Sequence, residues 1–275
     1  MKVHHVNCGS MSPRFADDHV CHVLILETRN GLVLVDSGFG LDDIRNPRAR
    51  VGAIRHLIRP RLDPAETAIS HVRALGFDPA DVRHIIATHL DIDHIGGLSD
   101  FPQATLHATV TEVDSAYSTR LASKIRYQRD QLPTTQESIV RHLPTADAWN
   151  GFVGVKELTE VSEDILLIPM PGHTRGHAAV AVGSDTGWVL HCGDSYYHRN
   201  SLTGSSAAPA MSRLFERLAA EDWPRVRANH DALAQLYQTR GHDLRIVCAH
   251  DRMQLEMAQD SQYSSPLGDL PNTEG

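Results

Sequence analysis

Residues 88–97 read Thr-His-Leu-Asp-Ile-Asp-His-Ile-Gly-Gly, which places His89, Asp91, Asp93 and His94 within six positions. Neutral imidazole nitrogens and carboxylate oxygens are ordinary ligands of zinc, iron and manganese. Crowded this closely, the four side chains would repel one another or compete for water unless a cation held them together. An acidic loop with incidental histidines is the alternative. Because further candidate ligands follow downstream, the stretch predicts a metal site.

The residues before and after this stretch indicate the end of a strand. Residues 84–88 are apolar and rich in β-formers, which is typical of a buried strand, and Gly96-Gly97 predicts a turn beyond the ligands. The same order of apolar strand, turn and ligand recurs three times: His173 follows 165–169, Asp194 follows 188–191, and His250 follows 246–249.

These residues resemble the ligand pattern of the metallo-β-lactamase superfamily of metallohydrolases. Members carry His-x-His-x-Asp-His, then a lone His often within Gly-His-Thr-x-Gly-His, then a bridging Asp and a last His. Residues 89–94, His173 within Gly-His-Thr-Arg-Gly-His, Asp194 and His250 match in order, over residues 1 to about 255. The resemblance implies a four-layer αββα sandwich, in which two β-sheets pack face to face between helices and the metals lie at the sheet edge.

The resemblance also implies two divalent metal ions, zinc first, with iron and manganese as alternatives. By this resemblance the first ion takes His89, Asp91 and His173, the second takes Asp93, His94 and His250, and Asp194 bridges both.

Asp91 departs from the pattern, because most members have a second His there. With two divalent ions and a bridging hydroxide, three ionised carboxylates make the site neutral, whereas a His would leave one positive charge. The additional negative charge should weaken the Lewis acidity of the first ion and favours harder metals. Direct ligation by Asp91 is the expectation, and a supporting role beside the ligands is the alternative.

Other residues are expected to support the ligands. Residues 35–38, Val-Asp-Ser-Gly, resemble the superfamily's Val-Asp-Thr-Gly element, in which Asp36 would accept a hydrogen bond from a liganding His. His177 is expected to orient a ligand rather than bind metal. Tyr197 has the spacing of the Tyr that polarises the substrate carbonyl in the acyl-homoserine-lactone lactonase branch, and its alternative is a packed aromatic.

The expected activity is therefore metal-dependent hydrolysis of an ester-like bond, with a lactone as the substrate. In this mechanism hydroxide attacks the carbonyl carbon, one ion and Tyr197 stabilise the oxyanion, and Asp93 or the second ion assists the leaving alkoxide. Thioester, sulfate-ester and phosphodiester hydrolysis share every ligand and stay open. A diiron redox enzyme and a non-catalytic metal-binding effector are the alternatives of another class.

Composition is consistent with this interpretation. A formal net charge of −8 and the lack of a basic cluster interleaved with aromatics argue against nucleic acid as a partner. No apolar run is long enough to span a membrane, and four cysteines without a C-x-x-C pair favour a reducing, cytoplasmic location. We expect a small-molecule substrate, and a homodimer is left open.

Nine β-type runs are expected as strands, at 3–7, 20–27, 32–36, 84–88, 105–107, 165–169, 178–182, 188–191 and 245–248, with helical patterns between them. This periodicity by itself predicts a mixed α/β or α+β fold. Residues 1–258 are expected to form one domain and 259–275 a flexible tail. The arginine-rich segment 45–61 is expected to be a solvated surface helix, and a lid over the substrate is the alternative. A cap low in strand signal at 117–152 and a loop at 10–18 are expected near the substrate. A helix is predicted from the Asp63-Pro64 pair to Gly76, and Glu112 is expected to close a capping box with Thr109.

Overall fold

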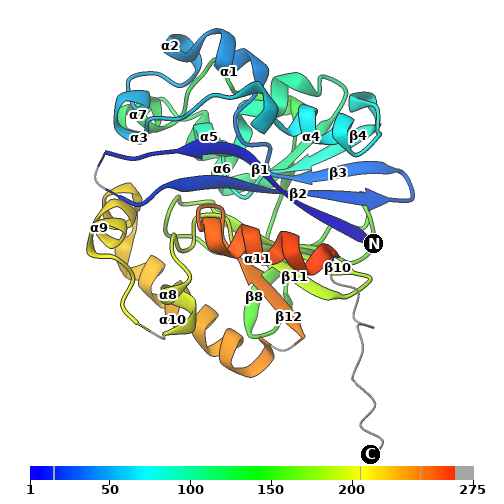
Figure 1. Ribbon diagram of the computed structural model, residues 1–275, viewed down its shortest axis with the longest axis vertical. Coiled ribbons are helices and arrows are strands. Elements are labelled where there is room, and N and C mark those ends of the chain that lie inside the picture. Colours follow the sequence, from blue (N-terminus) through cyan, green and yellow to red (C-terminus); the bar gives the residue numbers. More distant parts are fainter. Residues whose placement is uncertain (15, 205, 242, 264–275) are drawn as a thin grey trace, which may run out of the picture.

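Two six-stranded sheets pack face to face, and helices cover their outer faces (Figure 1). The first sheet has the order β1 Lys2–Met11, β2 His19–Thr28, β3 Gly31–Val35, β4 Val82–Ile86, β5 Thr105–Thr109, β6 Ile139–His142. The second has the order β12 Leu244–Val247, β11 Gly187–His191, β10 Ala178–Ser184, β9 Ile165–Pro169, β8 Phe152–Glu157, β7 Asp147–Trp149. This computed structural model describes residues 1–14, 16–204, 206–241 and 243–263.

The helices lie on both sides of the paired sheets. They are α1 Leu41–Arg45, α2 Pro47–Arg50, α3 Arg55–Ile58, α4 Ala68–Ala74, α5 Ile92–Ile95, α6 Val110–Ala116, α7 Leu121–Arg126, α8 Asn200–Thr203, α9 Ala210–Ala219, α10 Trp223–Arg240 and α11 Arg252–Tyr263. In Figure 1, α1, α2 and α4 lie on one side of the sheets, and α8 and α10 lie on the other. The αββα architecture is confirmed.

Side-chain alternation along β2 shows how the first sheet is buried on both faces. Val23 and Ile25 pack against the helices of the outer layer, whereas Leu24 and Leu26 pack against the second sheet. Successive strand residues point to opposite faces, so a strand covered on both sides is a continuous apolar run. The core between the sheets is completed by side chains from β3, β9, β10 and β11, such as Val33, Leu167, Val180 and Val189.

The nine strands expected from the sequence are present with shifted ends, and β6, β7 and β8 were missed. The expectation that 117–152 is a cap low in strand structure is therefore wrong beyond about residue 138. β6 and β7 are the outermost strands of their sheets, and exposed positions such as Arg141 and Asp147 interrupt their apolar pattern.

Two predicted helices are also divided. Asp63 caps only a 3-10 turn, Pro64–Glu66, and Thr67 has extended backbone angles before α4 begins. The arginine-rich segment forms the short helices α2 and α3, and Arg59 with φ 51° ends α3. Helix propensity favours one long helix in each segment, but the residues named here end each helix early.

The predicted tail begins too early. Residues 259–263 continue α11, and Gln259 Nε2 donates a hydrogen bond to the carbonyl of His5 at 3.0 Å. The rest of that prediction, residues 264–275, lies outside the described residues. No helix within the described ranges is long and apolar enough to cross a membrane.

Candidate metal centre

All seven predicted ligands meet at one edge of the two sheets. Their loops follow the carboxyl ends of β4 in the first sheet and of β9, β11 and β12 in the second. The side chains form a first group of His89, Asp91 and His173 and a second group of Asp93, His94 and His250, each with its ligand atoms within 4.8 Å of one another.

Asp194 lies between the two groups. Its Oδ2 is 3.3 Å from His173 Nε2, and its Oδ1 is 3.2 Å from His94 Nε2 and 3.1 Å from His250 Nε2. Oδ2 is also 3.2 Å from His250 Nε2, so the carboxylate lies within reach of both groups, as a bridging carboxylate must.

The donor atoms fit a metal ion. His89 Nε2, His94 Nε2 and Asp194 Oδ1 are buried and have no hydrogen-bond partner within the described ranges. Buried polar atoms are normally paired. In the first group His89 Nε2 is 3.5 Å and His173 Nε2 is 3.2 Å from Asp91 Oδ2. Donors that bind one ion at roughly 2.0–2.2 Å stand about this far apart.

Asp36 fixes one of the predicted ligands, His94. Its Oδ2 accepts hydrogen bonds from His94 Nδ1 and from the Thr88 hydroxyl, both at 2.8 Å, and its Oδ1 accepts from the Thr88 amide at 2.7 Å. Asp36 has φ 60°, in the left-handed region. The expected hydrogen bond from a histidine to Asp36 is present.

Asp36→Asn is expected to lower zinc affinity by about 10–100-fold, because the amide removes the charge that holds His94 Nδ1–H while asparagine still tolerates the left-handed backbone. A competition titration of the apoprotein against a chromophoric chelator measures this. An unchanged affinity would mean that His94 does not depend on Asp36.

His177 supports the site as expected. Its Nδ1 donates to the carbonyl of Met170 at 3.0 Å, which leaves Nε2 to accept the amide of Asp194 at 3.0 Å. These partners fix the tautomer of His177 and the position of the Asp194 backbone.

The carboxylates and imidazoles already compensate one another electrostatically. Burial lowers the pKa of His89 to about 4, so this imidazole is neutral and its lone pair is free for an ion. Burial also acts to lower the pKa of His94 and His250, but the neighbouring carboxylates, with Asp194 foremost, together outweigh it and raise both. Metal binding would replace these protons.

Arg126, at the end of α7, is a site residue that the sequence did not reveal. Its Nε donates to Asp91 Oδ1 at 2.8 Å, and its Nη2 donates to Asp91 Oδ2 at 2.6 Å. Although burial acts in the other direction, this guanidinium holds the pKa of Asp91 well below its usual range. An arginine in a polar segment gives no sequence signal of a partner 35 positions away.

Glu112 is a second missed residue, and the expected capping box is wrong. Thr109 does cap α6, since its hydroxyl accepts the Glu112 amide at 3.1 Å. The Glu112 side chain turns inward instead and accepts from Leu90 N–H at 2.9 Å, the Tyr127 hydroxyl at 3.1 Å and the Thr174 hydroxyl at 2.6 Å. One buried carboxyl thus joins both ligand loops of the first group to the segment after α7.

Tyr197 is buried beside the second group. Its ring centroid is 4.9 Å from that of His250 and 6.1 Å from that of Phe215 on α9. His19 is also buried, and its ring stacks on that of His250 at 5.3 Å. A pocket of ≈370 Å³ opens here, lined by Tyr197, His250, His19 and, from the predicted loop, Asp17 and Asp18.

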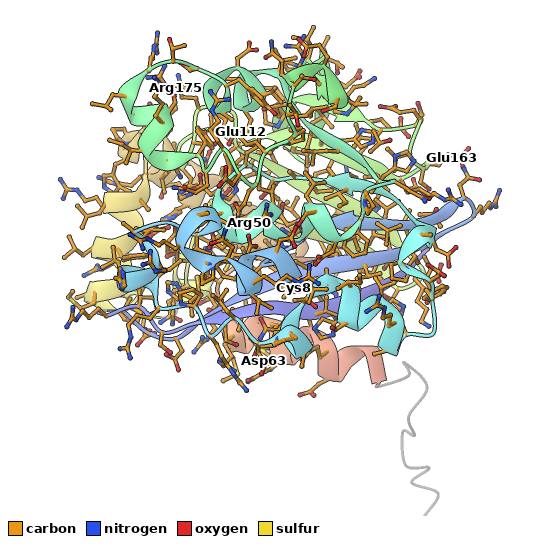
Figure 2. All side chains as sticks on the ribbon, turned by 90° about the horizontal axis from the view of Figure 1, so that it is seen from above. Cys8, Arg50, Asp63, Glu112, Glu163 and Arg175 are labelled. Carbon is orange, nitrogen blue, oxygen red and sulfur yellow. The ribbon has the colours of Figure 1, made fainter. Side chains whose placement is uncertain are left out.

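The arginine-rich segment mainly builds the scaffold. Figure 2 labels Arg50 on the helices over the first sheet, where its Nε donates to the buried Asp43 at 2.8 Å and its Nη2 to the Gly96 carbonyl at 3.2 Å. Arg50 therefore anchors the turn that follows the ligand stretch, rather than facing a substrate.

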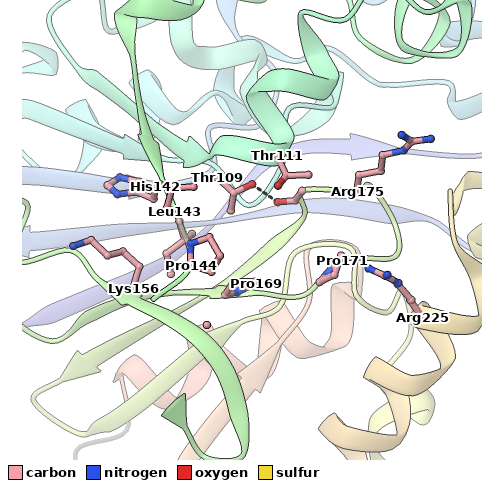
Figure 3. Close-up of a pocket in the computed structure, with 13 residues that line it drawn as sticks. Thr109, Thr111, His142, Leu143, Pro144, Lys156, Pro169, Pro171, Arg175 and Arg225 are labelled. Atoms are coloured by element: carbon pink, nitrogen blue, oxygen red, sulfur yellow. Dashed lines mark hydrogen bonds between the residues drawn. The ribbon is translucent and has the colours of Figure 1, made fainter. Parts of the chain in front are cut away.

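A further pocket of ≈290 Å³ lies beside the Gly176 loop, with Lys156, Arg175 and Arg225 in its lining (Figure 3). The dashed line in this view is the hydrogen bond of 2.6 Å from the Thr109 hydroxyl to the Gly176 carbonyl. None of the seven ligands lines it.

An αββα sandwich with histidines and aspartates gathered at its sheet edge is typical of a class of metallohydrolases. Residues 16–250 match the family model of the metallo-beta-lactamase superfamily, and the chain belongs to that superfamily. It is a metallohydrolase by family.

Similar proteins and solved structures are consistent with this family assignment. A "Probable metallo-hydrolase" of Mycobacterium tuberculosis is 45% identical over 262 residues, which are 95% of this chain and 84% of that protein. An N-acyl homoserine lactonase of Rhizobium radiobacter is 28% identical over 55% of each chain. The structure of an N-acyl homoserine lactone hydrolase with N-hexanoyl-L-homoserine at its catalytic metal center superposes with a TM-score of 0.67 and 19% identity, over 93% of this chain and 95% of that chain. This last likeness concerns the fold.

Proposed function

We propose that this protein is a metal-dependent hydrolase that opens lactones, with N-acyl homoserine lactones as the first substrates to test. The observation that carries the proposal is the pocket in which Tyr197 lies against His250, directly beside Asp194 and the second group. The lactonases among the relatives support the same substrate class.

The ligand set suits two divalent ions, with zinc first and iron or manganese as alternatives. The residues that would hold them are the first and second groups with Asp194 between them. When bound, such ions supply a hydroxide nucleophile near neutral pH and a Lewis acid for the carbonyl.

The protein's own residues would then position the substrate and move protons. Tyr197 lies where its hydroxyl can donate to the carbonyl oxygen of a substrate in the pocket, and burial raises its pKa well above 10, so it keeps its proton. Asp93 is less buried than Asp194 and lies 3.7 Å from His250 Nε2, so its carboxylate could take up the proton that the attacking hydroxide loses and pass it to the leaving alkoxide.

Tyr197→Phe is expected to lower kcat by about tenfold or more, because it removes one donor to the developing oxyanion while keeping the ring that packs on His250. Steady-state kinetics on a metal-loaded preparation provide the measurement. Equal kcat values for both proteins would assign Tyr197 to packing alone.

Helices α7 and α9 favour a substrate with an apolar chain. They meet above the site, where Arg126 Nη1 donates to the Ala219 carbonyl at 2.9 Å and Phe215 packs near Tyr197. Their exposed apolar side chains include Leu121, Ile125, Met211, Leu214 and Leu218. An acyl chain could lie along this surface.

A substrate panel tests the proposal. Metal-loaded protein is assayed with acyl homoserine lactones of several chain lengths, simple lactones, thioesters, sulfate esters and phosphodiesters. We expect lactone turnover that a chelator abolishes and added zinc restores. If no lactone is turned over, the lactonase assignment is wrong, and a thioester or phosphodiester signal would identify the alternative.

The remaining expectations belong to the same proposal. Four buried free cysteines support a reducing, cytoplasmic location. A small molecule suits the pocket, and we expect no nucleic acid or membrane partner; a homodimer is left to measurement by light scattering. Oxygen or nitric oxide consumption by iron-loaded protein would favour the diiron redox alternative, and the effector alternative would retain metal without turnover.

A further inference from the structure

The starting point is where the Arg126 guanidinium lies. Besides its two hydrogen bonds to Asp91, Arg126 Nη2 lies 2.6 Å from His173 Nε2. Asp91 Oδ2 and His173 Nε2 are atoms of the first group, and they also face each other at 3.2 Å. Arg126 therefore contacts the same donor atoms that would bind the first ion.

These contacts compete with a metal ion. A neutral imidazole has one lone pair on its unprotonated nitrogen, so His173 Nε2 can accept a hydrogen bond from Arg126 or bind an ion, but it cannot do both. A fixed positive charge at this distance, in a mostly buried place, also repels a second cation.

The hydrogen bonds at Nδ1, the ring nitrogen that does not face the metal position, also differ between the two groups. In the second group, His94 Nδ1 donates to the Asp36 carboxylate, and His250 Nδ1 donates to the Val20 carbonyl at 2.9 Å. In the first group, His89 Nδ1 contacts only a hydroxyl, that of Thr88, and His173 Nδ1 has no hydrogen-bond partner in the part of the chain that the structure describes. Acceptors at Nδ1 make Nε2 a better donor to metal.

We propose that Arg126 makes the two metal positions unequal. The second group fills first and tightly, and the first group fills weakly because an ion there must displace Arg126 from His173. The proposal rests on the metal dependence of the proposed function. It also explains the unusual Asp91, because Asp91 and Arg126 together form a neutral pair where most members have one neutral histidine.

Stepwise metal binding tests the proposal. Apoprotein is titrated with Zn²⁺ by calorimetry and with Co²⁺ by absorption, and the two dissociation constants are compared for wild type and Arg126→Met. For wild type we expect one tight and one weaker equivalent, separated by at least about tenfold. In Arg126→Met the separation should shrink by about tenfold, through tighter binding of the second equivalent.

Lys124→Met is the matched control. Lys124 is exposed on the same helix, so this variant removes a positive charge of α7 without touching the ligands, and it should bind metal like wild type. Arg126→Lys, which keeps the charge without the bidentate fork, should lie between wild type and Arg126→Met. Thermal unfolding of each apoprotein shows that the variants are folded.

The outcomes separate this proposal from the proposed function. Two equally tight equivalents in wild type, or the same separation in wild type and Arg126→Met, would overturn the role of Arg126 and leave lactone hydrolysis standing. The other outcome is that the two metal equivalents bind unequally, that Arg126→Met reduces the difference, and that no lactone is turned over. This result would uphold the role of Arg126 and reject the lactonase assignment.

Discussion

Asp194→Ala loses at least about a thousandfold in kcat/KM, equivalent to roughly 4 kcal/mol, and is purified with little metal. The reason is geometric, because the Asp194 carboxylate lies between the groups, 3.3 Å from His173 Nε2 of the first and 3.1–3.2 Å from His94 and His250 Nε2 of the second. Without this carboxylate the two groups lose their shared ligand and one of the three carboxylates of the site. Elemental analysis and steady-state kinetics on the same preparation measure both effects.

Ser195→Ala is the control for this variant. Ser195 is the next residue in the chain and is equally buried, and its hydroxyl has no hydrogen-bond partner among the described residues. It should keep metal content and turnover. If Asp194→Ala kept full metal content, the assignment of Asp194 as the bridging ligand would be contradicted.

Glu112→Ala lowers the free energy of unfolding by about 3–5 kcal/mol. The substitution leaves the Leu90 amide and the Tyr127 and Thr174 hydroxyls without their acceptor in the protein interior, and an unpaired buried donor costs about 1–3 kcal/mol. Urea denaturation of the apoprotein gives this value without a contribution from metal.

Glu112→Gln is the matched variant, since its carbonyl oxygen still accepts from Leu90 and Tyr127. Burial raises the pKa of Glu112 from 4.5 to about 7. Between these values the folded state holds the proton and the unfolded state does not, so wild type loses stability as pH rises from 4.5 to 7. Glu112→Gln should lack this dependence. A small effect of Glu112→Ala would show that water replaces the carboxyl.

The sequence was most informative where one short segment carries both the strand and the ligand. In residues 84–94 the apolar run is β4 and the ligands follow it directly, and the loops carrying His173, Asp194 and His250 repeat this order. The resemblance of this pattern to one superfamily then predicted the sandwich, which the structure and the family match confirm.

The missed features depend on contacts between distant segments. Arg126 meets Asp91 and Glu112 meets Thr174 only because α6 and α7 fold over the ligand loops, and neither pair has a characteristic spacing. The sequence gives no signal for His19, because its stacking partner, His250, is near the other end of the chain. The edge strands β6 and β7 were missed because solvent exposure removes the periodicity on which strand prediction depends.

The donors of the metal centre come from both sheets, which has a consequence for the lifetime of the protein. His89, Asp93 and His94 follow the first sheet, whereas Asp194 and His250 follow the second, so a bound ion cross-links two halves of the chain. An ion that binds only the folded chain adds about 2.7 kcal/mol of stability when its free concentration is a hundredfold above its dissociation constant. When metal becomes scarce, the halves separate more often and expose the apolar side chains between the sheets to proteases. The abundance of this protein should therefore follow the metal supply of its surroundings.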